Sequence, residues 1–122
     1  MKRSAILAFA LTSIVGVAAG EQPSQTPMKC ETGPASRQFG GSAWIVYSCD
    51  DQHSMVVISS ESNPASPFYF VLKAQDGKYD IHGEGNGSQE ASDAAGKELS
   101  QLSSTALADL LAATKAKAAG HH

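Results

Sequence analysis

The fold is decided by residues 43–60, AWIVYSCDDQHSMVVISS, in which two apolar runs flank a short polar segment. The first run, 43–49, is rich in aromatic and β-branched residues and is apolar at both alternate sets of positions. This composition is typical of a strand that lies centrally in a sheet. Residues 50–52 predict a polar turn, and 53–60 predicts a second strand. Because the link is so short, we expect the two strands to form an antiparallel hairpin.

Two further strands are predicted after this hairpin. Residues 68–74 alternate between two faces, with Phe68 and Phe70 on the face that is expected to fill the core. An Asp-Gly dipeptide, which tolerates positive φ, then predicts a tight turn into a strand over 78–82. The glycine-rich stretch 83–87 is expected to end the β part of the chain.

A helical pattern follows the strands. Ser88 is a suitable N-cap, and small or apolar residues recur at helical spacing as far as Leu102. Either Ser103 or Ser104 caps a second helix, which Gly120 ends. Strands first and helices last predict an α+β domain, with an antiparallel sheet of four to five strands followed by two C-terminal helices packed on one face.

The chain begins with the layout of a secretory signal peptide. Residues 1–20 combine a basic start, an uncharged apolar run that is too short to span a membrane, and small residues at the end. Residues 21–29 predict a flexible leader, and 30–119 predicts a single α+β domain. We therefore expect a periplasmic or secreted protein without a membrane anchor.

The two cysteines, Cys30 and Cys49, are expected to form a disulfide because the protein is predicted to be exported. Such a bond closes a loop of about 20 residues and stabilises the fold by roughly 3 kcal/mol in the chain-entropy model. It would hold down residues 28–42, which are expected to be irregular or to form a short edge strand. A redox-active pair is the alternative, but the spacing differs from Cys-x-x-Cys.

The acidic balance argues against nucleic-acid binding. Residues 1–20 hold two of the nine basic residues and none of the twelve acidic ones, so seven basic and twelve acidic residues remain, for a net charge of −5. A domain with this charge and no basic cluster repels phosphate backbones and anionic membrane surfaces. No nucleic acid is expected as a partner.

Ionisable residues in and near the last predicted strand form one candidate site, for a metal ion. Asp80, His82 and Glu84 alternate along the chain and so lean to one side of a strand, and His53 or Asp51 is the nearest donor from another segment. Alternate strand residues are about 7 Å apart, so a metal ion needs donors from more than one segment. The alternative is the solvated polar face of an edge strand. We expect no cofactor.

The loop before the third strand forms a second candidate site, for a protein partner. Prolines stiffen a loop and reduce the entropy that is lost on docking, and aromatic side chains are good interface anchors. The alternative is that the loop only turns the chain. The expected binding residues are Asn63, Pro64, Ser66, Pro67 and Tyr69.

Two resemblances add to these patterns. The stretches 63–70, 83–85 and 99–115 together resemble a group of small exported proteobacterial proteins of unknown function, a likeness that implies no activity. Residues 47–51 and 56–58 are similar to the early strand pair of the membrane-bound and periplasmic C-type lysozyme inhibitors. That family is an all-β barrel whose inhibitory loops carry Ser-Gly-x-x-Tyr and a later Lys-Gly. Neither motif occurs here, so no inhibitory residue is carried over.

The favoured hypothesis is a non-catalytic protein-binding or inhibitor-like module whose partner is another envelope or extracellular protein. It rests on the small size, the expected disulfide and the stiff proline loop. No serine lies in a Gly-x-Ser-x-Gly motif, and the cysteines are expected to be bonded to each other. The alternative is a small metal-dependent or histidine-based hydrolase that uses His53, Asp80 and His82.

Overall fold

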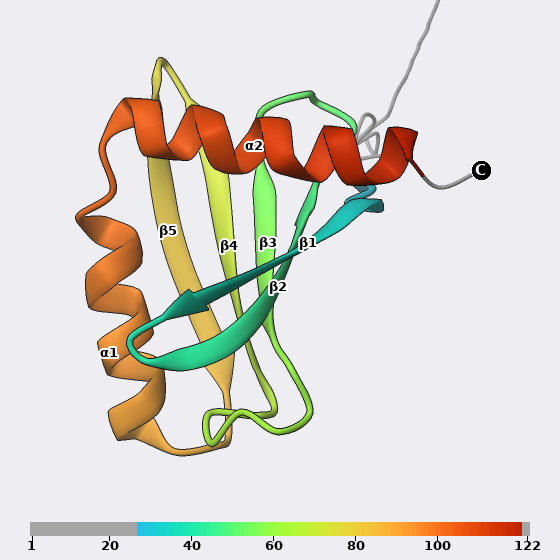
Figure 1. Cartoon of the computed structure of the whole chain (residues 1–122). Helices are drawn as coiled ribbons and strands as arrows, with labels where there is room; N and C mark the ends of the chain where they lie inside the picture. The colour runs from blue at the N-terminus through green and yellow to red at the C-terminus, as the bar shows by residue number, and fades with distance from the viewer. Residues whose placement is uncertain (1–26, 121–122) are drawn as a thin grey trace, which may run out of the picture.

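The computed structural model describes residues 27–120, which form a five-stranded antiparallel sheet followed by two helices (Figure 1). The sheet order follows the chain order from β1 to β5, so each strand pairs with its neighbour in sequence. The predicted α+β class is therefore confirmed. The elements are β1 (Thr32–Phe39), β2 (Ser42–Ser48), β3 (Met55–Ser59), β4 (Phe68–Gln75), β5 (Lys78–Gly85), α1 (Gln89–Ser100) and α2 (Ser104–Ala119).

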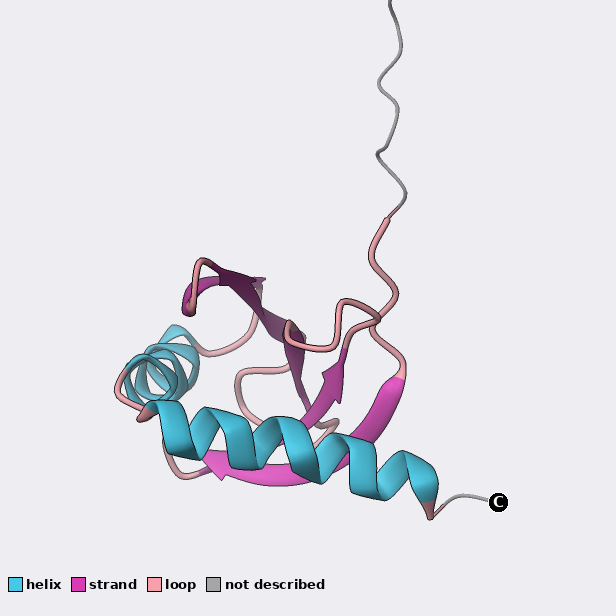
Figure 2. Cartoon of the chain, turned by 90° about the horizontal axis from the view of Figure 1, so that it is seen from above, coloured by secondary structure: helices cyan, strands magenta, loops and turns pink. Residues whose placement is uncertain are grey.

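The two helices cover one side of the sheet, which we call the inner face. α1 runs alongside the strands, and α2 crosses them near β1 and β2 (Figure 1). Seen from above, the sheet is strongly curved (Figure 2). Within the described part of the chain, no helix is both long and apolar enough to cross a membrane. The predicted signal peptide (1–20) and most of the predicted leader (21–29) lie outside the described residues.

The inner face holds the core because alternate residues of each strand point towards the helices. Trp44, Met55 and Leu72 are fully buried there, and α1 and α2 contribute Leu99 and Leu110. Three aromatic rings meet at the centre: the Trp44 ring packs 5.4 Å from the ring of Phe70 and 6.3 Å from that of Phe68. The predicted core positions of Phe68 and Phe70 are confirmed.

Residues 28–42, which were expected to be irregular or to form a short edge strand, contain the eight-residue edge strand β1. Its pairing with β2 shifts register between Thr32 and Ala35, where Gly33 has a φ of 138°. The following turn packs directly on α1. A Cβ on Gly40 would lie 2.5 Å from the backbone nitrogen of Ala95, and the Gly40 amide donates to Glu98 Oε1 at 2.7 Å. Gly40 thus makes a close contact between the strand turn and the helix, within a stretch that was expected to be irregular or a short strand.

The turn between β2 and β3 is built on one carboxylate. Asp51 Oδ1 accepts from the amides of His53 and Ser54 at 2.9 and 2.7 Å, and Oδ2 accepts from the Ser54 hydroxyl at 2.6 Å. These bonds hold His53 and Ser54 in the turn, so β3 begins at Met55 and not at the predicted His53.

The strand β5 continues to Gly85 and so extends past the predicted end at residue 82, although the β part does end within 83–87 as expected. Gly83 pairs with Phe70, and Gly85 pairs with Phe68. A Cβ on Gly83 would lie 2.7 Å from Cδ1 of Phe70, so this glycine leaves room for the aromatic rings of the inner face.

Both helices begin at serine caps, as predicted. The hydroxyls of Ser88 and Ser103 accept from the amides of Ala91 and Ala106, respectively. Of the two candidates for the second cap, the structure selects Ser103.

The predicted disulfide is confirmed, because Cys30 and Cys49 are bonded with an S–S distance of 2.06 Å. The chain just before β1 is also held by the backbone, since the Asp50 amide donates to the Lys29 carbonyl at 2.8 Å. The disulfide therefore fixes the start of β1 to the end of β2.

Candidate binding groove

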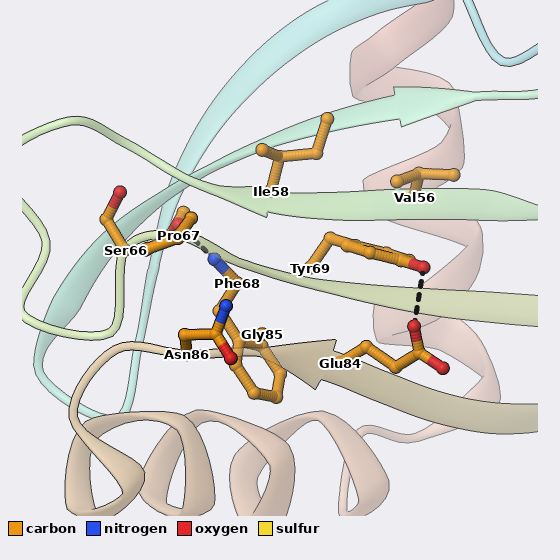
Figure 3. Close-up of a pocket in the computed structure, with 10 residues that line it drawn as sticks. Val56, Ile58, Ser66, Pro67, Phe68, Tyr69, Glu84, Gly85 and Asn86 are labelled. Carbon is orange, nitrogen blue, oxygen red and sulfur yellow. Dashed lines mark hydrogen bonds between the residues drawn. The ribbon is translucent and has the colours of Figure 1, made fainter.

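The side of the sheet that faces away from the helices, which we call the outer face, is apolar at its centre. Cα pairing places Ile45, Ile58 and Tyr69 in one row across β2, β3 and β4, and a parallel row contains Tyr47, Val56 and Val71. Tyr69 is 40% exposed, and the other five side chains are half-buried. No helix within residues 27–120 covers this surface; in Figure 3 one helix passes behind the strands and the other lies beside β5.

A groove of about 510 Å³ lies at the end of this face, next to the loop that joins β3 and β4. Its floor is apolar, and Figure 3 shows Val56 and Ile58 on one strand beside the Tyr69 ring on the next. The loop forms one wall, and the end of β5 forms another. The lining residues are Val56, Ile58, Ser59, Ser66, Pro67, Phe68, Tyr69, Glu84, Gly85 and Asn86.

A polar cluster borders the groove on β5. The Tyr69 hydroxyl donates to Glu84 Oε1 at 3.1 Å, and His82 Nε2 lies 3.5 Å from Glu84 Oε2. The hydrogen bond to Glu84, together with the charge of that carboxylate, raises the pKa of Tyr69 above its ordinary value of 10.0. The protonated phenol is the donor in this hydrogen bond.

The loop wall is held in place by hydrogen bonds from below. The Asn63 side chain donates from Nδ2 to the Ala43 carbonyl at 2.6 Å, and its Oδ1 accepts from the Ala65 amide at 2.8 Å. At the other end of the loop, the Phe68 amide donates to Ser59 Oγ at 3.0 Å. The wall is thus ordered before any partner binds.

The loop is also bonded to the chain that follows β5. The Asn86 amide donates to the Pro67 carbonyl at 3.0 Å, and the Ser88 amide donates to the Pro64 carbonyl at 2.9 Å. The segment that leads into α1 therefore supports the wall of the groove.

The structure separates the predicted binding residues into two groups. Ser66, Pro67 and Tyr69 line the groove. Asn63 is only 5% exposed, so its part is to build the loop. Pro64 is exposed but does not line the groove.

The four predicted metal-binding residues do not gather at one point. Asp80, His82 and Glu84 lie on the outer face of β5, opposite residues 73, 71 and 69 of β4. His53 lies in the turn before β3, where its carbonyl accepts from the Tyr79 hydroxyl at 2.7 Å. In the described residues, no group of three or more His, Cys, Asp or Glu side chains could hold a metal ion.

Sequence reasoning missed the floor of the groove, Val56 and Ile58. The run MVVI is apolar at every position, so periodicity alone does not reveal which of its side chains stay uncovered. The available signal was the similar pattern in 43–49, because two neighbouring strands that are apolar on both faces predict two apolar sheet faces.

Comparison with models of protein families, with curated proteins and with solved structures finds no match to this chain. Residues 27–120 define an α+β domain in which helices cover one face of the sheet and no helix of this range covers the other.

Proposed function

We propose that the protein is a non-catalytic binding module, inhibitor-like in its action, that docks another protein on its outer face. One observation carries the proposal: an apolar groove with an exposed tyrosine lies on a sheet face that no helix within residues 27–120 covers. Contiguous apolar patches on soluble proteins often mark interaction sites.

The ordered loop wall supports this function. The hydrogen bonds of Asn63 and Ser59 fix the loop in the absence of a partner, so docking costs little loop entropy. Tyr69 has the properties of an interface anchor, because it offers a large apolar ring with a polar hydroxyl at its tip.

The charge of the rim indicates the chemistry of the partner. Glu84 places a carboxylate beside the apolar floor, and the whole chain is acidic, with a formal net charge of −3. The expected occupant is a polypeptide segment with an apolar side chain for the floor and a neighbouring lysine or arginine for Glu84.

We place this partner among envelope or extracellular proteins. The signal-peptide pattern of residues 1–20 favours export, and a disulfide between Cys30 and Cys49 fits an oxidising compartment. The protein then meets its partner in the periplasm or outside the cell.

Site-specific photocrosslinking tests the proposal in intact cells. A photoreactive amino acid at Ile58 is expected to give one discrete adduct, because this side chain lines the groove. The same probe at Lys115, exposed on α2, is the control and is expected to give none. Absence of the Ile58 adduct, or the same adduct from both positions, overturns the proposal.

The crosslinked partner is then purified and its affinity measured. Tyr69→Ala is expected to weaken binding by about 2 kcal/mol, or roughly thirtyfold, as for an interface anchor. Tyr69→Phe keeps the ring and loses only the hydrogen bond to Glu84, so it is expected to stay within about threefold of the wild type. Equal losses for both variants would show that the ring is not the anchor.

A further inference from the structure

The strand β5 is an edge of the sheet with a free side. Among residues 27–120 it pairs only with β4, along its whole length from Lys78 to Gly85 and without a break in register. Every second residue of such a strand directs its amide and carbonyl away from the sheet, ready to pair with another strand. The other edge strand, β1, differs because α2 packs along it.

The outer side of β5 carries an ordered set of charges. Lys78, Asp80, His82 and Glu84 are all exposed, and they lie on the outer face together with their β4 partners. On the outer face, the positions on either side of Ile81 pair an acidic residue with a basic one. Asp80 matches His82, and Lys78 matches Glu84.

We propose that a second copy of this chain pairs antiparallel with β5 about a twofold axis at Ile81, joining the two sheets edge to edge. The side chain of Lys78 then lies opposite Glu84 of the second copy, and Asp80 lies opposite its His82. Opposite charges directly across an antiparallel pair are favourable, and the twofold axis makes each pair occur twice.

The charges disfavour the two registers whose axes lie one residue to either side of Ile81. A twofold axis at Asp80 would place two aspartates opposite each other, and an axis at His82 would place Asp80 opposite Glu84 of the second copy. Both arrangements set like charges across the pair, which is unfavourable. Pairing about Ile81 also places even-numbered residues opposite even-numbered ones and odd opposite odd. Residues whose amide and carbonyl point away from the sheet therefore lie opposite the equivalent residues of the second copy.

Charged side chains on an edge strand have another known use, which is to prevent pairing with other chains. The two uses predict a different dependence of the oligomeric state on protein concentration. A contact that is one strand long is small, so the proposed dimer is weak and forms as concentration rises.

The test is sedimentation velocity over a wide concentration range, with protein recovered from cells that express the full chain. The wild type is expected to shift from monomer to dimer. Lys78→Glu and Glu84→Lys each place like charges across the pair twice, so each is expected to weaken dimerisation by roughly ten- to a hundredfold. Lys73→Glu changes the charge equally on β4, away from the free edge, and is expected to stay within about threefold of wild type.

Mixing the two variants gives the decisive measurement. In a mixed dimer, Glu at position 78 of one chain faces Lys at position 84 of the other, and the second pair is also complementary. An equimolar mixture is therefore expected to dimerise as the wild type does. A wild type that stays monomeric, single variants that dimerise normally, or a mixture no better than its components overturns the proposal. Glu84 lines the groove but Lys78 does not, so Lys78→Glu tests the dimer without changing the groove and its outcome does not decide the proposed function.

Discussion

The two faces of the sheet are made by the same strands but differ in what covers them. On the inner face, Trp44, Val57 and Leu72 are buried under the helices. On the outer face, the neighbouring side chains of Ile45 and Ile58 are apolar too, yet only half-buried. The pleat places successive residues on opposite faces, so both surfaces follow from one apolar run per strand.

Because of this difference, alternate residues of a single strand serve two purposes, one set for stability and the other for binding. Side chains that helices cover contribute to the free energy of unfolding, because unfolding exposes their full area. Side chains on the outer face are only partly buried, so a fraction of their apolar area remains available to a partner. One strand can therefore supply both the core and a docking surface.

The largest expected effect on the free energy of unfolding comes from a substitution on the inner face. Trp44→Ala removes a ring that packs on Phe68 and Phe70 and an indole that donates to the Phe39 carbonyl, so it should lower the free energy of unfolding by about 3–5 kcal/mol. Ile45→Ala, one residue along the chain on the outer face, should cost about 1 kcal/mol or less. Denaturant unfolding of both variants measures the difference.

If Trp44→Ala does not fold, Val57→Ala and Val56→Ala make the same comparison with smaller changes. Val57 is 0% exposed on the inner face, whereas Val56 is half-buried on the outer face. Equal losses from the two valines would contradict the distinction between the faces.

The fold could be predicted from the sequence because its signals are local. The hairpin turns, the serine caps and the alternation in 68–74 each depend on residues close in the chain. The extension of β5 could not be predicted in this way. Taken alone, Gly83 suggests the end of a strand. A glycine is needed at this position because the Phe70 ring of the neighbouring strand occupies the space of a side chain.

The candidate site could be predicted only in part. Ser66, Pro67 and Tyr69 follow from the composition of one loop, which periodicity and proline content reveal. Glu84 was predicted as a metal ligand, and it joins the groove because β4 pairs with β5 in a register that sets it opposite Tyr69. A contact between strands depends on register, which no single segment encodes.

An intermediate effect is expected at a pair of buried hydroxyl groups on the inner face. The hydroxyls of Thr114 and Ser48 are hydrogen-bonded at 2.7 Å, and both residues are almost fully buried. Thr114→Val should cost about 1–3 kcal/mol in the free energy of unfolding, because it leaves the Ser48 hydroxyl buried without this partner. Adding Ser48→Ala should recover part of the loss, whereas an additive double variant would show that the two hydroxyls do not interact.

The smallest expected effect concerns the turn between β2 and β3. This turn fixes the pairing register of the two strands, and so determines which residues lie on which face. Burial raises the pKa of Asp51, but the hydrogen bonds from Ser54 and His53 outweigh it and lower the pKa below its ordinary value of 3.8. The folded state therefore favours the carboxylate, so this stabilisation is present above pH 4 and is lost as the pH falls through the lowered pKa. The contribution should stay below about 1 kcal/mol, because Asp51 is exposed and solvent screens it.

Unfolding measured between pH 7 and about pH 2.5 tests this contribution. The free energy of unfolding should fall less steeply with acid for Asp51→Asn than for the wild type. Asp50→Asn removes the same charge without these hydrogen bonds, and a decline as shallow as that of Asp51→Asn would assign the effect to net charge alone.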